Sequence, residues 1–145
     1  MFFVSNLAFG ETKQGFTNLL DELRSVDAAE VASVERELIF LWSKTGSASA
    51  DLILKRAEAE MAQQKFHDAA DRFATLCELV PDHAASHLGY AQALYALGYI
   101  GPAIAELEVA LRIETQFYPA LYTLAQIYEA LDRKELAFRT YQAVH

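Results

Sequence analysis

A spacing of 34 residues between small and large apolar side chains dominates the second two-thirds of this chain. The spacing relates Ala57, Ala91 and Ala125, then Ala69, Ala103 and Ala137, and finally Phe73, Leu107 and Tyr141. A fixed period of this length is typical of stacked helix–turn–helix units, each of which buries its apolar face against its neighbours. The sequence therefore predicts an all-α fold in which helix hairpins stack into a superhelix.

Short breaks divide this part of the chain into expected helices. We expect them over residues 50–64, 66–79, 84–97, 100–113, 118–131 and 134–144. Pro81 follows the end of one helix, and Pro102 is tolerated only in the first turn of another, which places that start near residue 100. Because the breaks are only a few residues long, successive helices must pack antiparallel as hairpins.

The first third of the chain lacks this spacing, and we expect residues 16–49 to form a two-helix N-terminal cap. Phe16, Leu19, Leu20 and Leu23 predict a helix over 16–25. A second helix, capped by Asp27, would bury one stripe made of Val31, Val34, Leu38, Leu41 and Trp42. Gly46 can take the left-handed conformation that ends such a helix. Terminal units of repeat arrays are atypical, which fits a cap.

Residues 1–15 begin with an apolar stretch for which two interpretations stay open. The stretch is either the remnant of a trimmed signal peptide over residues 1–10 or an apolar arm that packs on the domain. The first interpretation favours a periplasmic or exported protein, and the second a cytoplasmic one. Cys77 is the only cysteine, so an intrachain disulfide is impossible.

The charge balance bears on the class of partner. Twenty acidic residues against 12 basic ones give a formal net charge of −8. Such a surface repels phosphate backbones and anionic lipid. No run approaches the roughly 18 apolar residues that span a bilayer. We therefore expect neither nucleic acid nor a membrane span, and look to a protein or peptide partner.

The repeated residues resemble the tetratricopeptide repeat (TPR) family, whose period is also 34 residues. The third repeat supplies Leu121, Leu124, Ala125, Tyr128, Asp132, Ala137, Tyr141 and Val144, and the second supplies His87, Tyr90, Ala91, Leu94, Gly98, Ala103, Leu107 and Ala110. The first supplies Ile53, Ala57, Gln64, Ala69, Phe73, Leu76 and Pro81, but Arg56 and Glu60 depart from the pattern. Those two would be exposed or would pair with the cap. The resemblance implies a right-handed solenoid of three repeats, 50–83, 84–117 and 118–145.

The cap has a looser resemblance of its own. Leu41-Trp42 and Gly46-Ser47 ahead of the first repeat are similar to short TPR proteins of alphaproteobacteria, which often carry a signal peptide.

The resemblance also implies a concave groove lined by the first helix of each repeat. Its positions here are Leu54, Glu58, Met61, Leu88, Gln92, Tyr95, Tyr122, Gln126 and Glu129. Family members that clamp acidic peptide tails use Lys, Arg and Asn at these places, and this chain has none of them there. The groove would suit an apolar or mildly basic segment with Tyr95 and Tyr122 as anchors. The alternative is that these tyrosines only pack helix on helix.

Catalytic and metal chemistry find little support in the sequence. Cys77, His83 and His87 form a ligand-like group, but their spacing matches no standard zinc pattern, and we expect one buried thiol and two ordinary histidines. We interpret Glu106 and Glu108 as acidic residues on the solvated face of a helix. No glycine-rich nucleotide loop is present. We therefore predict no catalytic residues, no metal and no cofactor.

Two functions remain in view. The first is a non-catalytic scaffold that binds a peptide or partner helix in the groove. The second is a structural protein that self-assembles through an uncapped last repeat, residues 118–145, or through the apolar arm, residues 2–9, which could also occupy a groove.

Overall fold

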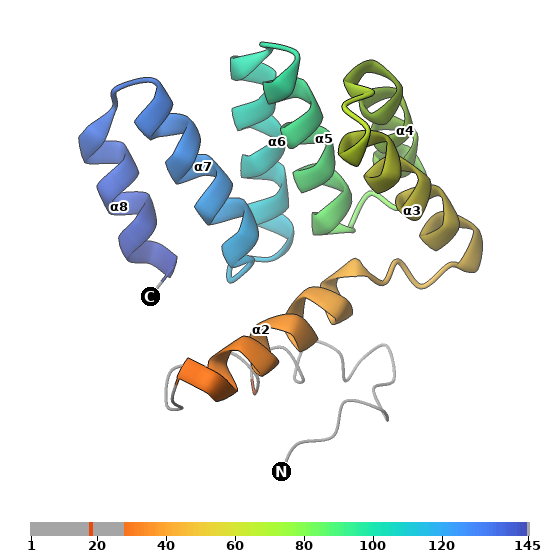
Figure 1. The fold of residues 1–145 in the computed structure, drawn as a ribbon, viewed down its shortest axis with the longest axis horizontal. Helices are drawn as coiled ribbons and strands as arrows, with labels where there is room; N and C mark the ends of the chain where they lie inside the picture. Colours follow the sequence, from red (N-terminus) through yellow and green to blue (C-terminus); the bar gives the residue numbers. More distant parts are fainter. Residues whose placement is uncertain (1–17, 19–27, 145) are drawn as a thin grey trace. The chain divides into compact units, whose positions relative to one another are not determined.

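The computed structural model describes residue 18 and residues 28–144, and Figure 1 shows their fold. The chain separates into two compact units, with the division between Lys44 and Thr45. The first unit contains α2 (Ala28–Ser43). The second contains α3 (Ala48–Ala62), α4 (Phe66–Leu79), α5 (Ala84–Ala96), α6 (Ile100–Ile113), α7 (Tyr118–Ala130) and α8 (Lys134–Val144). No strand occurs among the described residues, which confirms the all-α prediction.

Helix α2 lies where the sequence predicted a helix after Asp27. Val34, Leu38 and Trp42, spaced four residues apart, are its buried side chains, while Ile39 and Phe40 are exposed. Gly46, beyond the helix, has a φ of 84°, the left-handed conformation expected there. The expected helix over 16–25, its neighbour Asp27 and the apolar arm lie outside the residues described, apart from Asn18.

Helix α3 begins two residues earlier than the sequence predicted, because Ser47 caps it. The Ala50 N–H donates to Ser47 Oγ at 3.3 Å. Asp51, in the first turn, accepts from the Thr45 backbone N–H at 2.9 Å and from its hydroxyl at 2.7 Å. These bonds fix the chain entering the repeat array. The starts of the other five array helices match the predicted residues.

The turn inside each hairpin has the same backbone geometry. Gln64, Gly98 and Asp132, again 34 residues apart, have φ values of 60°, 88° and 57°. The residue after each one donates its N–H to a carbonyl five residues back, at 2.8 Å in Lys65→Glu60, 2.9 Å in Tyr99→Leu94 and 2.8 Å in Arg133→Tyr128. This is the Schellman arrangement, which satisfies carbonyls at a helix end. The repeat is therefore a repeat of backbone conformation as well as of side chains.

Packing follows the chain order. Helices α3 and α4, α5 and α6, and α7 and α8 form hairpins, and α5 packs on α4 (Figure 1). The contact of α7 with α6 is less extensive than that of α5 with α4. The small residues at the crossings are buried as predicted, namely Ala57, Ala91, Ala125, Ala69, Ala103 and Ala137. Methyl groups at these points let helix axes approach closely.

A close approach between the first two repeats involves a glycine outside the predicted spacing. A Cβ placed on Gly89, in α5, would lie 2.2 Å from Cε1 and 2.4 Å from Cζ of the buried Phe73 ring on α4. No real Cβ tolerates such a distance. Gly89 is therefore required by the packing of α5 on α4, although glycine is a poor helix former.

The structure shows the surroundings of Arg56 and Glu60, the two residues that depart from the family pattern. Arg56 is exposed. Glu60 on α3 makes a forked ion pair with Arg72 on α4, through Oε1 to Nε and through Oε2 to Nη2, the latter at 3.0 Å. The arginine hydrogen bond and charge lower the pKa of Glu60. The sequence had offered the cap as a partner for Glu60. Here its bidentate partner lies in the same repeat.

Candidate functional site

The first helices of the three repeats form one continuous layer. Helix α5 contacts both α3 and α7 in addition to its neighbours along the chain. The nine expected groove residues fall into three sets spaced by 34: Leu54, Leu88 and Tyr122; Glu58, Gln92 and Gln126; and Met61, Tyr95 and Glu129. Equivalent positions on adjacent, equivalent helices share a face, so these residues form a candidate binding surface, called here the A-helix face.

Their exposure separates what could touch a ligand from what supports the fold. Glu58, Gln92, Tyr122, Gln126 and Glu129 are exposed. Met61, Leu88 and Tyr95 are half-buried. Leu54 differs from the expectation, because it is only 5% exposed and belongs to the hydrophobic core around Phe73. Leu54 supports the surface from beneath instead of presenting a side chain to a partner.

Tyr122 packs against a neighbouring helix and still exposes much of its ring. Its ring meets that of Tyr141 on α8 edge to face, with centroids 5.4 Å apart and planes at 74°. Even so, 51% of Tyr122 remains exposed. Such an edge-to-face pair fixes the ring without covering it. Tyr122 is therefore a rigid, accessible aromatic side chain.

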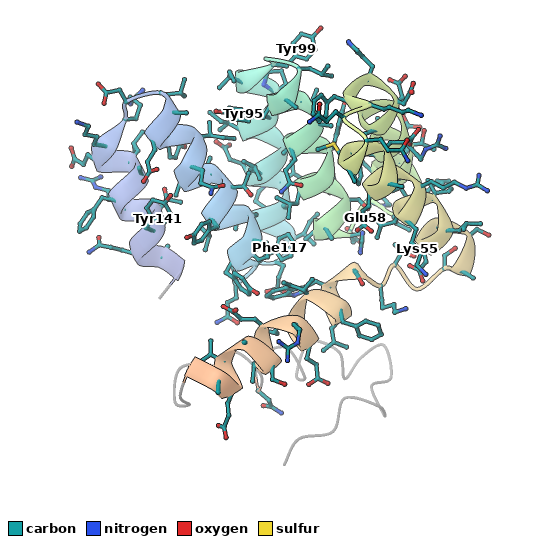
Figure 2. All side chains as sticks on the ribbon, viewed as in Figure 1. Lys55, Glu58, Tyr95, Tyr99, Phe117 and Tyr141 are labelled. Carbon is teal, nitrogen blue, oxygen red and sulfur yellow. The ribbon has the colours of Figure 1, made fainter. Side chains whose placement is uncertain are left out.

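The charged side chains of the A-helix face are acidic. Figure 2 shows Lys55 and Glu58 on α3 and Tyr141 on α8. Partial burial raises the pKa of Glu58, and the nearby Lys55 ammonium acts in the opposite direction. Burial also raises the pKa of Tyr141, with further contributions from the Glu129 charge and from a hydrogen bond with that carboxylate. Tyr141 was predicted only as a core residue, but Glu129 of the A-helix face also influences its pKa.

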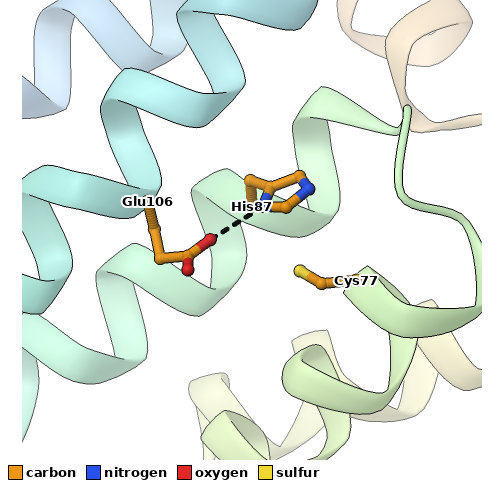
Figure 3. A group of neighbouring side chains, drawn as sticks. All are labelled: Cys77, His87 and Glu106. Atoms are coloured by element: carbon orange, nitrogen blue, oxygen red, sulfur yellow. Dashed lines mark hydrogen bonds and ion pairs between the residues drawn. The ribbon is translucent and has the colours of Figure 1, made fainter.

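A second group of polar side chains lies among α4, α5 and α6 and is drawn in Figure 3. The sequence grouped Cys77 with His83 and His87. Instead, His83 Nδ1 lies 2.7 Å from Ser86 Oγ, and Glu106 joins Cys77 and His87. His87 Nδ1 lies 2.7 Å from Glu106 Oε2, and its Nε2 lies 3.0 Å from the Pro81 carbonyl. Glu106 on α6 thus contacts His87 on α5 and is only 25% exposed, which corrects its assignment to a solvated face.

Comparison with known proteins identifies the type of array. No model of a known protein family matches the chain. A TPR repeat-containing protein of Rhizobium etli is 24% identical over 136 residues, which cover 93% of this chain and 67% of the relative. The paired helices and the three equivalent left-handed turns agree with that similarity. The chain has the tetratricopeptide-repeat fold.

Solved structures agree with the TPR assignment. A structure of MamA, a TPR-type helical-repeat protein, matches with a TM-score of 0.61 and 20% identity, covering 93% of this chain and 72% of MamA. A point mutant of MamA matches with a TM-score of 0.59 and 14% identity, covering 95% and 96% of the two chains. The described helices of this TPR chain include none that is long and apolar enough to cross a membrane.

Proposed function

We propose that the chain is a non-catalytic protein-interaction scaffold whose A-helix face binds an apolar or mildly basic peptide or partner helix. The observation that carries the proposal is a surface with a fixed, half-exposed aromatic ring and with carboxylates but no cation at its nine positions. Aromatic side chains give large contact area at low entropic cost. Glu58 and Glu129 disfavour an acidic segment and favour a basic one.

Proteins similar to this chain support the coarser part of this proposal. The Rhizobium etli relative is a TPR repeat-containing protein, and proteins of this type are generally scaffolds for protein contacts. The choice of groove and the chemistry of the bound segment rest on the residues of the A-helix face alone.

A capture experiment with matched variants tests the groove. The wild type, a Tyr95→Ala/Tyr122→Ala double variant and a Tyr99→Ala control are immobilised and exposed to extract from the source organism. Tyr99 is 53% exposed and precedes α6, outside the A-helix face. We expect a partner that the wild type and the control retain and the double variant loses. If the double variant keeps its helicity and still retains the partner, the proposal that the A-helix face binds it is contradicted.

Self-association through the last repeat is a second candidate, favoured by exposed apolar side chains there. Leu131 is 44% exposed and Phe138 is 62% exposed. Exposed apolar patches tend to acquire a partner. Light scattering should then give a mass that rises with concentration in the wild type and stays at the monomer in Leu131→Lys/Phe138→Lys. A wild-type monomer at every concentration contradicts this candidate. The residue 2–9 arm is tested separately by deleting residues 1–10.

A further inference from the structure

We propose that Cys77, His87 and Glu106 form a zinc-binding site that joins the first two repeats. The three side chains come from α4, α5 and α6, and each offers one ligand atom (Figure 3). These atoms all lie within 4.8 Å of one another. Sulfur, imidazole nitrogen and carboxylate oxygen are the three ligand types that Zn²⁺ takes in proteins, and three of them with a water complete a tetrahedral site.

The distances are close to those that zinc requires. Zinc–ligand bonds of about 2.0–2.3 Å in a tetrahedron place the ligand atoms about 3.3–3.8 Å apart. The pair His87 Nδ1 and Glu106 Oε2, now 2.7 Å apart, would separate slightly, and the Cys77 sulfur would approach by about 1 Å. Side-chain rotations supply movements of this size, so the helices can stay in place.

His87 already has the partner that a zinc-bound imidazole uses. Its Nε2 lies 3.0 Å from the Pro81 carbonyl oxygen, which can only accept, so this nitrogen carries a hydrogen. A histidine that binds a metal typically donates its other ring N–H to a carbonyl or carboxylate, which fixes the tautomer. The Pro81 contact therefore leaves Nδ1, the nitrogen facing Glu106, as the ligand atom.

Zinc would form one bond each to Cys77 Sγ, His87 Nδ1 and a Glu106 carboxylate oxygen. Cysteine binds zinc as the thiolate, so the proton of the Cys77 thiol passes to solvent as the ion binds.

Solvent reaches the cluster. Cys77 is not fully buried, and 25% of the Glu106 side chain is exposed, which gives solvent access for the fourth ligand. A bound ion would lock α4 of the first repeat to α5 and α6 of the second.

Calorimetric titration of the chelator-treated full chain with a zinc salt is the first test. We expect saturation at one equivalent and, from buffers of different ionisation enthalpy, release of at least one proton per zinc, that of the Cys77 thiol. Cys77→Ser and Glu106→Gln should each weaken binding more than about tenfold. His67→Asn is the matched control, because His67 is an exposed histidine on α4 away from the cluster. No saturable binding by the wild type, or unchanged binding by both ligand variants, overturns the proposal, as does loss of binding in the control.

Cobalt(II) provides a readout that does not depend on how well a variant folds. Cys77 is the only cysteine of the chain, so a thiolate-to-cobalt charge-transfer band in the wild type can come only from this site. We expect that band at one equivalent of cobalt and its removal by added zinc. Cobalt binding without the band means that Cys77 is not a ligand and refutes the site.

Discussion

Replacing Gly89 by alanine should destabilise the array, even though alanine is the better helix former. The new methyl would lie 2.2 Å from Phe73 Cε1, whereas carbon atoms in ordinary contact are about 3.5–4.0 Å apart. Phe73 is 2% exposed, so its ring is enclosed by neighbouring side chains. Overpacking on this scale costs about 2–3 kcal/mol, and the gain in helix propensity offsets about 1. We expect a net loss of about 1–2 kcal/mol.

Urea unfolding followed by far-UV circular dichroism measures this loss. Gly101→Ala is the matched control, because Gly101 lies in the first turn of α6 with nothing within 4 Å of a new Cβ. The control should be neutral or slightly stabilising. Thermal unfolding should show a fall of about 4–8 °C for each kcal/mol lost.

A double-mutant cycle identifies the cause. Phe73→Leu removes the ring atoms that the new methyl would meet, so it should cost distinctly less in the Gly89→Ala background than in the wild type. The coupling should reach at least about 0.5–1 kcal/mol. If Gly89→Ala stabilises the protein as Gly101→Ala does, or if the two substitutions are additive, the packing argument is refuted.

Three further predictions concern an ion pair, two turns and the thiol. The lowered pKa of Glu60 means that its pair with Arg72 stabilises the fold at neutral pH and is lost as the pH falls below the ordinary carboxyl value of 4.5. The difference in the free energy of unfolding between wild type and Glu60→Gln should therefore shrink in acid. Urea unfolding at neutral pH and again well below pH 4.5 measures this difference. Gln64→Gly and Asp132→Gly should each raise stability by about 0.5–1 kcal/mol, because both residues hold left-handed φ angles, and a lower unfolding temperature would contradict this. Burial raises the pKa of Cys77 to about 12, and a smaller thiolate fraction outweighs the greater nucleophilicity of a more basic thiolate, so native alkylation, with chelator present, should be at least about tenfold slower than in urea. Equal rates would disprove that burial.

The sequence predicted the helices well because the 34-residue spacing combines many weak signals. Each crossing needs a small residue, and each hairpin turn needs a left-handed residue, so errors at one repeat are corrected by the others. Gly98 is an obvious turn residue, whereas Gln64 and Asp132 were identified only by their spacing from it.

Structural features that occur in only one repeat could not be predicted from the spacing. Gly89 aligns with Lys55 and Thr123 in the other repeats, so nothing in the spacing marked it. Glu106 resembled an ordinary exposed acid until α6 was placed against α5. Leu54 occupies a groove position in the family pattern but is buried here. Such details depend on which side chains from other helices fill the neighbouring space. The period of the sequence does not specify those contacts.

The less extensive contact between α6 and α7 has a thermodynamic consequence for the A-helix face. In a repeat array, each interface between neighbouring hairpins adds to the free energy needed to separate them. The α7–α8 hairpin, which carries Tyr122, Gln126 and Glu129, therefore separates from α6 at a lower free energy than the first hairpin separates from α5. A segment bound across all three A helices would stabilise the closed form of this unit. The measured association constant of that segment would equal its intrinsic association constant multiplied by the fraction of molecules in which the hairpin is closed.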